Sequence, residues 1–167
     1  MSACTVRSAT REDAAAINDI QNYYVERSTA TFLTEPLTLE ERLAWFDEHK
    51  DAHPVTVATS GAGIVGWGAL GTFRPRQAYS GTAELSVYVH HEWHRRGIGR
   101  AIVCDLVERA AALGYHALVG GCCSEAEPSI ALLEALGFSR VAHFPEVGRK
   151  FGRWLDVVFV QRLIIQA

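Results

Sequence analysis

One stretch of the chain decides its fold: Ser86-Val-Tyr-Val-His-His-Glu-Trp-His-Arg-Arg-Gly-Ile-Gly-Arg-Ala101. It opens with the β-branched and aromatic residues that strands favour, and a basic turn with two glycines follows. Residues 97–113 then have the apolar spacing of a helix, and Gly114 stands where a C-terminal cap would end it. The stretch therefore predicts a strand, a glycine turn and a helix in succession.

The glycine turn suits a pyrophosphate. Glycines let backbone N–H groups approach a ligand closely, and the first turn of a helix has unpaired N–H donors and a partial positive charge. The turn lacks the Gly-Lys-Ser/Thr ending of a Walker loop, and Ile102 stands where the dinucleotide fingerprint has its third small residue. Both motifs are thereby excluded, while a tight turn under solvated arginines remains open as a purely structural explanation.

The flanking sequence predicts one mixed β-sheet with helices on both faces. Thr10-Arg-Glu-Asp13 and the capping box Thr38-Leu-Glu-Glu41 each begin a helix, and the first helix is expected to end near Val25. Another helix is expected over residues 128–136. The β-rich runs predict strands over residues 5–9, 54–59, 64–72, 83–90, 117–123 and 154–164. This order is typical of an α/β or α+β fold.

Length and composition indicate a single domain spanning residues 1–167. The formal net charge of −3 lacks the basic excess of a nucleic-acid binder. Residues 1–11 lack the apolar run of a secretory signal, and nowhere do 18 apolar residues follow one another. We therefore expect a cytoplasmic protein that binds neither nucleic acid nor a membrane.

Residue types that bind metals are dispersed along the chain. The four cysteines form no CxxC pair, so reduced thiols packed as small apolar groups are expected. His90 and His94 have an i, i+4 spacing, but they do not lie on a predicted helix. No metal site is expected.

The glycine turn and four further segments resemble the GNAT acetyltransferase superfamily. Its signature is Arg or Gln, two residues, Gly, any residue, then Gly or Ala, and the window here reads His94-Arg-Arg-Gly-Ile-Gly99, with His94 as the departure. The further segments are Thr82-Ala-Glu-Leu-Ser-Val-Tyr-Val89, Pro128-Ser-Ile-Ala-Leu132, Leu136-Gly-Phe138 and Val147-Gly-Arg-Lys-Phe-Gly-Arg-Trp-Leu-Asp156. Together they look like the phosphinothricin and methionine sulfoximine acetyltransferase branch.

The resemblance implies the GNAT fold, in which strands four and five splay apart to admit the pantetheine arm of acetyl-CoA, the expected co-substrate. Main-chain groups of Val87, Tyr88 and Val89 would meet the pantetheine amides. The residues expected around the pyrophosphate are Arg95, Arg96, Gly97, Ile98, Gly99 and Arg100. The resemblance also implies a homodimer that forms through residues 147–156.

Glu84 is the expected catalytic base. An amine must be neutral to attack a thioester, so the reaction needs a proton acceptor, and by resemblance Glu84 matches the glutamate that takes this proton directly or through water. Side chains alternate along a strand, so Glu84 faces the same way as Ser86. An exposed carboxylate at a strand edge is the alternative for this residue.

The substrate is expected to bind beside Glu84. The residues expected to contribute are Arg74, Pro75 and Arg76 of the preceding loop together with Glu84, Leu85 and Ser86. Three positions depart from the branch. Ser80 replaces an Arg of the substrate loop, Ala126 replaces an Asn near the cofactor, and Leu133 replaces the Tyr or His that protonates the departing thiolate.

The sequence therefore predicts an acyltransferase that moves acetyl from acetyl-CoA to the α-amine of a small amino-acid-like substrate such as phosphinothricin, methionine sulfoximine or methionine sulfone. Ser80 leaves open an N-acetyltransferase for another small amine or an antibiotic. Ala126 and Leu133 leave open an acyl-CoA-binding sensor without turnover.

Overall fold

The computed structural model describes residues 4–49, 51–61 and 63–164. Its strands are β1 (Thr5–Ser8), β2 (Val55–Ser60), β3 (Gly63–Thr72), β4 (Thr82–Val89), β5 (Ala117–Cys123), β6 (Ser139–Lys150) and β7 (Arg153–Leu163). Its α-helices are α1 (Ala14–Arg27), α2 (Leu39–Glu48), α3 (Ile98–Ala112) and α4 (Glu127–Ala135). Short 3-10 turns lie at Arg11–Asp13, Gln77–Tyr79 and His91–Trp93.

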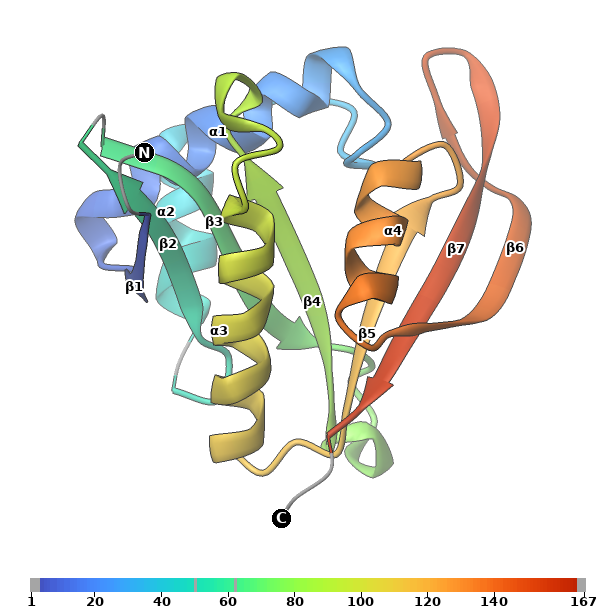
Figure 1. Cartoon of the computed structure of the whole chain (residues 1–167). Helices are drawn as coiled ribbons and strands as arrows, with labels where there is room; N and C mark the ends of the chain where they lie inside the picture. Colours follow the sequence, from blue (N-terminus) through green and yellow to red (C-terminus); the bar gives the residue numbers. More distant parts are fainter. Residues whose placement is uncertain (1–3, 50, 62, 165–167) are drawn as a thin grey trace.

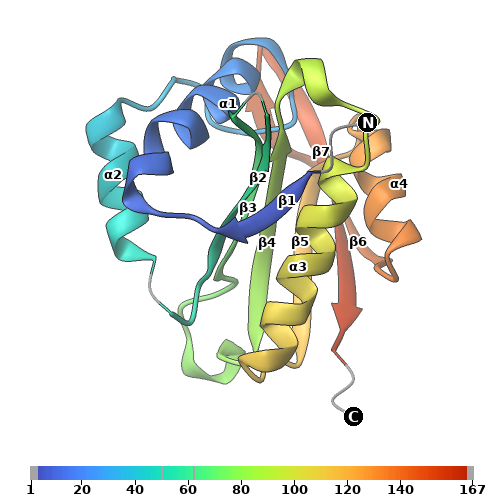
Figure 2. The same ribbon diagram turned by 60° about the vertical axis from the view of Figure 1, so that its left-hand side comes forward.

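The strands form one mixed sheet in the order β1-β2-β3-β4-β5-β7-β6 (Figure 1). Neighbouring strands are antiparallel except for β4 and β5, which run parallel. Helices α1 and α2 cover one face of the sheet and α3 and α4 the other, as Figure 2 shows. The predicted mixed sheet with helices on both faces is thereby confirmed.

Strands β4 and β5 separate soon after they begin. They pair only where Thr82–Glu84 lies beside Ala117–Val119. From Leu85 and Gly120 onward each strand pairs on its other side alone, β4 with β3 and β5 with β7. The expected splay is therefore present, and it opens toward the N-terminal end of α3 (Figure 1).

Helix α3 lies directly on β3, and this contact fixes the position of the glycine turn. A Cβ atom on Gly68 would come within 2.5 Å of Ile102 and 2.8 Å of Leu106. Ile102 and Leu106 are fully buried in the core between α3, α4 and the sheet. Only glycine at position 68 allows the helix to come this close.

The predicted capping box of α2 is confirmed. The Glu41 N–H donates to the Thr38 Oγ1 over 3.2 Å, and the Glu41 carboxylate accepts from the Thr38 N–H over 2.8 Å. The four cysteines are free, as expected. Within the described residues, each helix is too short or too polar to cross a membrane.

Strand β6 was not predicted. Pro145 interrupts its sequence, Glu146 adopts a φ of +49°, and the register with β7 shifts between Phe144 and Gly148. Most of its side chains are exposed, since it is an edge strand and has a neighbour on one side only. A bulged, exposed edge strand lacks the alternation that identifies strands in sequence, and such strands tolerate proline.

Candidate functional site

The gap between β4 and β5 is lined on one side by main-chain groups of β4. The His90 N–H donates to the Val65 carbonyl oxygen over 2.9 Å, while Val89 pairs with Gly66 and Val87 with Gly68. Residues of an antiparallel pair alternate between hydrogen-bonded and non-hydrogen-bonded positions. The peptide groups of Val87 and Val89 therefore point away from β3 and into the gap.

Main-chain groups of β5 line the other side. The Ser124 N–H donates to the Asp156 carbonyl oxygen over 3.0 Å, and Cys123 and Gly121 pair with residues of β7. The same alternation turns the peptide groups of Gly121 and Cys123 into the gap. An extended ligand with amide groups fits between two such edges, as a peptide does when it adds to a sheet.

Tyr88 was expected to meet the pantetheine amides together with Val87 and Val89, but the direction of its peptide groups differs from theirs. Its peptide groups face β3, and its ring packs against Trp67 with centroids 5.1 Å apart. Its hydroxyl bonds to Thr31 and Gln21, and burial raises its pKa. The side chain thus belongs to the core beneath α1 and α2.

The glycine turn places unpaired N–H groups at the mouth of the gap. Gly97 caps α3 with a φ of +79°, which favours glycine, while Ile98 is buried in the core. A Cβ atom on Gly99 would lie 3.0 Å from Leu132 of α4, so this glycine also allows the close approach of α3 and α4. The first N–H groups of α3 have no partner within the helix.

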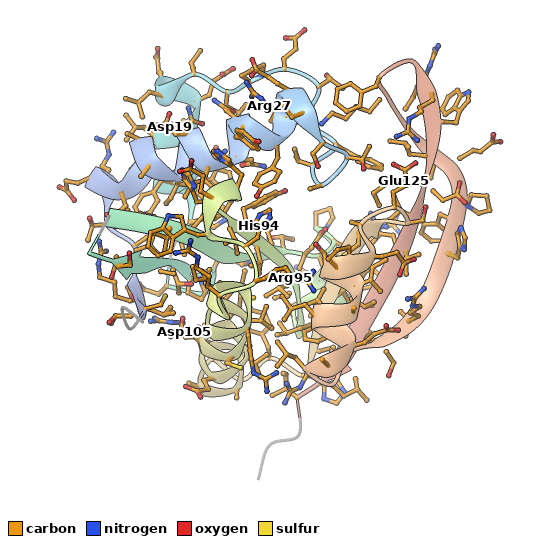
Figure 3. The ribbon with its side chains drawn as sticks, turned by 45° about the horizontal axis from the view of Figure 1, so that its top comes forward. Asp19, Arg27, His94, Arg95, Asp105 and Glu125 are labelled. Carbon is orange, nitrogen blue, oxygen red and sulfur yellow. The ribbon has the colours of Figure 1, made fainter. Side chains whose placement is uncertain are left out.

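Three arginines surround this helix end. Arg96 lies over the Trp93 ring, 4.5 Å from its centroid. Within the described parts of the chain, Arg95, Arg96 and Arg100 form no ion pair with a carboxylate. Figure 3 looks onto this end of the molecule and shows His94 and Arg95 at the start of α3. Unpaired cations beside a helix N-terminus suit a multiply charged anion.

His94, which departs from the GNAT signature, is bonded to α1. Its Nε2 lies 2.5 Å from the Tyr24 hydroxyl, which donates to the Val89 carbonyl oxygen in the gap. Because that hydroxyl proton goes to Val89, His94 donates to Tyr24. Burial raises the pKa of Tyr24 to about 12, so the hydroxyl stays protonated. The turn is thereby tied to the end of β4.

A cleft of about 200 Å³ borders the start of the gap. It is lined by Trp45 of α2, His49 at the C-terminal cap of that helix, residues 69–72 of β3, and Glu84 and Ser86 of β4. Glu84 and Ser86 share this face, as predicted, and Glu84 is the last residue of β4 that pairs with β5. Leu85 instead packs into the core on the face of α3, so its side chain does not reach the cleft.

The electrostatic environment of Glu84 has two opposing parts. Burial raises the pKa of this carboxyl group, and the positive charge of Arg74 lowers it. The Arg74 guanidinium lies 5.2 Å from the centroid of the Phe73 ring. Arg74 and Glu84, which were predicted to share a site, thus lie close enough for their charges to interact. Arg74 is exposed in the loop, as Pro75 and Arg76 are, and it does not line the cleft itself.

Sequence reasoning missed the α2 wall of the cleft. Arg42 is 1% exposed, donates to Asn18 over 3.3 Å and also to Gln21, and lies over the Trp45 ring at 4.6 Å. This buried cation fixes Trp45 at the cleft. No local sequence pattern predicts that α2 lines the cleft, because α2 meets β3 only in the folded chain.

The histidines near the turn do not form a convincing metal centre. Among the described residues, His90, His91 and Glu92 bring possible ligand atoms within 4.8 Å of one another. The two imidazole rings are stacked with centroids 4.5 Å apart and planes 20° apart, so their lone pairs lie in nearly parallel planes, which is unfavourable for binding one ion together. The absence of a metal site stays a prediction.

Comparison with known proteins identifies the family. The model of the acetyltransferase (GNAT) domain matches residues 6–159. The L-methionine sulfoximine/L-methionine sulfone acetyltransferase of Pseudomonas aeruginosa is 39% identical over 94% of this chain and 92% of that protein. The phosphinothricin N-acetyltransferase of Streptomyces viridochromogenes is 36% identical over 94% of this chain and 86% of that protein.

A solved structure agrees. The GNAT superfamily phosphinothricin acetyltransferase from Sinorhizobium meliloti, crystallised in complex with acetyl-CoA, superposes with a TM-score of 0.92 at 33% identity. The match covers 96% of this chain and 88% of that one. The chain therefore belongs to the GNAT acetyltransferase family, and it is an acyltransferase.

Proposed function

We propose that this acyltransferase moves acetyl from acetyl-CoA to the α-amine of a small amino-acid-like substrate such as methionine sulfoximine, methionine sulfone or phosphinothricin. The observation that carries the proposal is the cleft at Glu84, which borders the start of the gap between β4 and β5. A half-buried carboxylate thus lies beside an opening lined by main-chain groups. The relatives above are named for acetylation of these compounds.

The chain has suitable partners for two parts of acetyl-CoA, the pantetheine arm and the pyrophosphate. The peptide groups of Val87 and Gly121 suit the amides of an extended pantetheine arm. The N-terminus of α3, with Arg95, Arg96 and Arg100, suits the pyrophosphate. When bound, acetyl-CoA supplies an acetyl group activated as a thioester.

In the proposed reaction, Glu84 takes a proton from the substrate ammonium group. An α-amine has a pKa of about 8, so its deprotonation at pH 7 costs about 1.4 kcal/mol. Because burial raises the pKa of Glu84, this carboxylate binds a proton more readily than an exposed glutamate does. The Val87 N–H, directed into the gap, would polarise the thioester carbonyl.

No side chain is assigned to protonate the departing thiolate. Leu133 is a buried apolar residue in α4, and Ala126 precedes that helix with a methyl group. A thiolate with a pKa near 8.5 is a tolerable leaving group at neutral pH. Solvent can therefore supply this proton, at some cost in rate.

Arg74 is our proposed partner for the substrate carboxylate, because it is the cation that acts on Glu84. Ser80, which follows the turn Gln77–Tyr79 of the same loop, favours the second candidate, another small amine. An arginine at position 80 would have added a third cation to this loop, beside Arg74 and Arg76.

A thiol-release assay tests the function. The purified chain is mixed with acetyl-CoA and a panel of L-amino acids that includes methionine sulfoximine, methionine sulfone and phosphinothricin, alongside amines without a carboxylate. We expect the highest kcat/KM for the three tetrahedral compounds. Faster turnover of another amine would identify that class of amine as the substrate. Tight acetyl-CoA binding without thiol release would indicate a sensor.

We also propose a homodimer formed through β6 and β7. The exposed large apolar side chains on these two strands and the turn between them are Val141, Phe144, Val147, Phe151, Trp154 and Leu163. The hairpin thus carries six of the ten exposed large apolar side chains among the described residues, which favours an interaction surface there. A second copy of the same surface would cover them.

A further inference from the structure

We propose that His49 receives the proton that Glu84 removes from the substrate amine and passes it to solvent. The inference rests on the proposed function, because it requires an amine in the cleft. It assigns a role to the residue that caps the C-terminal end of α2.

The chemistry requires one proton to leave the site in each turnover. A substrate ammonium ion and a thioester yield an amide, a thiol and one free proton. The nitrogen loses two protons, of which one ends on the thiol sulfur and the other on the first acceptor, Glu84. Unless Glu84 passes this proton on, it enters the next cycle protonated and cannot act as a base.

His49 lies where such a proton can leave. It lines the cleft of about 200 Å³ that contains Glu84, and it also lines a second cavity of about 270 Å³. Polar residues of the second cavity include Ser8, Asp51, His53 and Arg109. Among the described residues, only His49 lines both cavities, so it lies between the Glu84 cleft and a separate polar opening.

The hydrogen bonds of His49 leave Nε2 as the proton acceptor. Nδ1 lies 2.8 Å from the Trp45 carbonyl oxygen, which can only accept, so Nδ1 carries the hydrogen. Nε2 then holds the lone pair, and within the described residues no hydrogen bond occupies it. The Trp45 ring, 4.1 Å away between centroids, holds the imidazole in place.

The surrounding charges suit a transient proton carrier. Groups around His49 are Arg42 and Glu48 of α2, His53, Glu84 in the same cleft, and Asp51 and Arg109 in the second cavity. Burial lowers the pKa of His49, so the ring is neutral at pH 7, while burial raises the pKa of Glu84. These opposite shifts bring the proton affinities of the two groups closer together, which favours transfer between them, directly or through water.

The test variant is His49→Asn. The amide nitrogen of Asn occupies the place of Nδ1 and keeps the bond to Trp45, whereas the acceptor Nε2 is lost. In dilute buffer near neutral pH we expect kcat to fall about tenfold, with the KM for acetyl-CoA unchanged. Added imidazole should restore the rate, and the rate of the variant should rise with buffer concentration. His116→Asn is the matched control, because His116 is exposed and lines neither cavity, and it should keep the wild-type kcat.

Two results would overturn the relay. One is a wild-type kcat in His49→Asn at every buffer concentration. The other is a loss of rate that neither imidazole nor buffer restores, which would mark a structural role. His49→Gln must show the same dependence on buffer, since its amide is not a base. If the wild-type protein acetylates no amine, the proposed function fails, whereas turnover that is insensitive to His49 contradicts the relay alone.

Discussion

Burial and one neighbouring charge shift the pKa of the Glu84 carboxyl group in opposite directions. Burial raises its pKa, and the charge of Arg74 lowers it. Arg74 is also the proposed partner of the substrate carboxylate. The pH dependence of the reaction and the binding of the substrate therefore depend on the same pair of side chains.

Replacing Glu84 with Gln preserves size and removes the proton acceptor. We expect kcat to fall by roughly 10²–10⁴ at neutral pH, and the loss to shrink at higher pH, where more of the amine is already neutral. Steady-state kinetics from slightly acidic to alkaline pH measure this. Ser86→Ala changes the neighbouring side chain on the same face and should leave the pH profile unchanged. An equal kcat for Glu84→Gln and wild type across the range would remove Glu84 from the reaction.

Replacing Arg74 with Ala should have two effects. Loss of a charged hydrogen bond should weaken binding of carboxylate substrates by about 1.5–3 kcal/mol. Glu84 acts as a base only when ionised, so activity falls as the pH drops through its pKa. Removing the cation raises that pKa further, so the acidic limb of the kcat profile should move to higher pH.

Arg76→Ala is the matched control for Arg74→Ala, because Arg76 lies exposed in the same loop. It should leave the acidic limb in place. If the ratio of kcat/KM for an amino acid to that for its amide is the same in Arg74→Ala as in the wild type, Arg74 does not bind the substrate carboxylate.

At the level of single residues, the sequence predicts those residues of the candidate site that belong to one strand or one turn. Glu84 and Ser86 follow from strand alternation, and Gly97 follows from the turn before α3. Trp45 and His49 do not, because they reach the cleft through the packing of α2 on the sheet. Their contribution depends on contacts between segments that are distant in sequence.

Among the helices and strands, the helices whose first residues carry a capping or glycine signal were predicted well. Helix α3 begins at Ile98, since Gly97 adopts a left-handed conformation, and α2 begins after its capping box at Thr38. Strand β6 had no such signal, and its omission was wrong. Its bulge and edge position make its sequence resemble a loop.

The close packing of α3 on β3 can be tested at Gly68. A Cβ atom on Gly68 would lie 2.5 Å from Ile102 and 2.9 Å from the Ser86 carbonyl oxygen. Gly68→Ala should therefore reduce the free energy of unfolding by about 1–3 kcal/mol. It should also raise the KM for acetyl-CoA more than that for the amine, because α3 carries the glycine turn.

Urea unfolding and steady-state kinetics measure the two effects of Gly68→Ala. Gly71→Ala is the control for stability, because a Cβ atom there would meet nothing within 4 Å. Equal stability of Gly68→Ala and wild type would show that α3 does not lie so close to β3.

For the whole molecule, the β6–β7 hairpin, which carries the proposed dimer surface, is joined to the loop after α1. The Lys150 Nζ donates to the carbonyl oxygens of Ser28 and Thr31, each over 2.7 Å. A Cβ atom on Gly148 would collide with the Phe32 ring, so this ring packs directly on β6. The loop after α1 therefore fixes the hairpin and holds its apolar side chains in a defined arrangement.

Replacing Trp154 with Glu tests whether that surface joins two copies of the chain. Trp154 is 58% exposed, so a charge there should leave the fold of one subunit intact while it disrupts an apolar interface. We expect wild type to sediment as a dimer and Trp154→Glu as a monomer. Leu113→Glu is the matched control, because Leu113 is 45% exposed at the end of α3, outside the hairpin, and it should remain dimeric. A wild-type protein that sediments as a monomer over a wide range of concentration would contradict the dimer, and a dimeric Trp154→Glu would place the interface elsewhere.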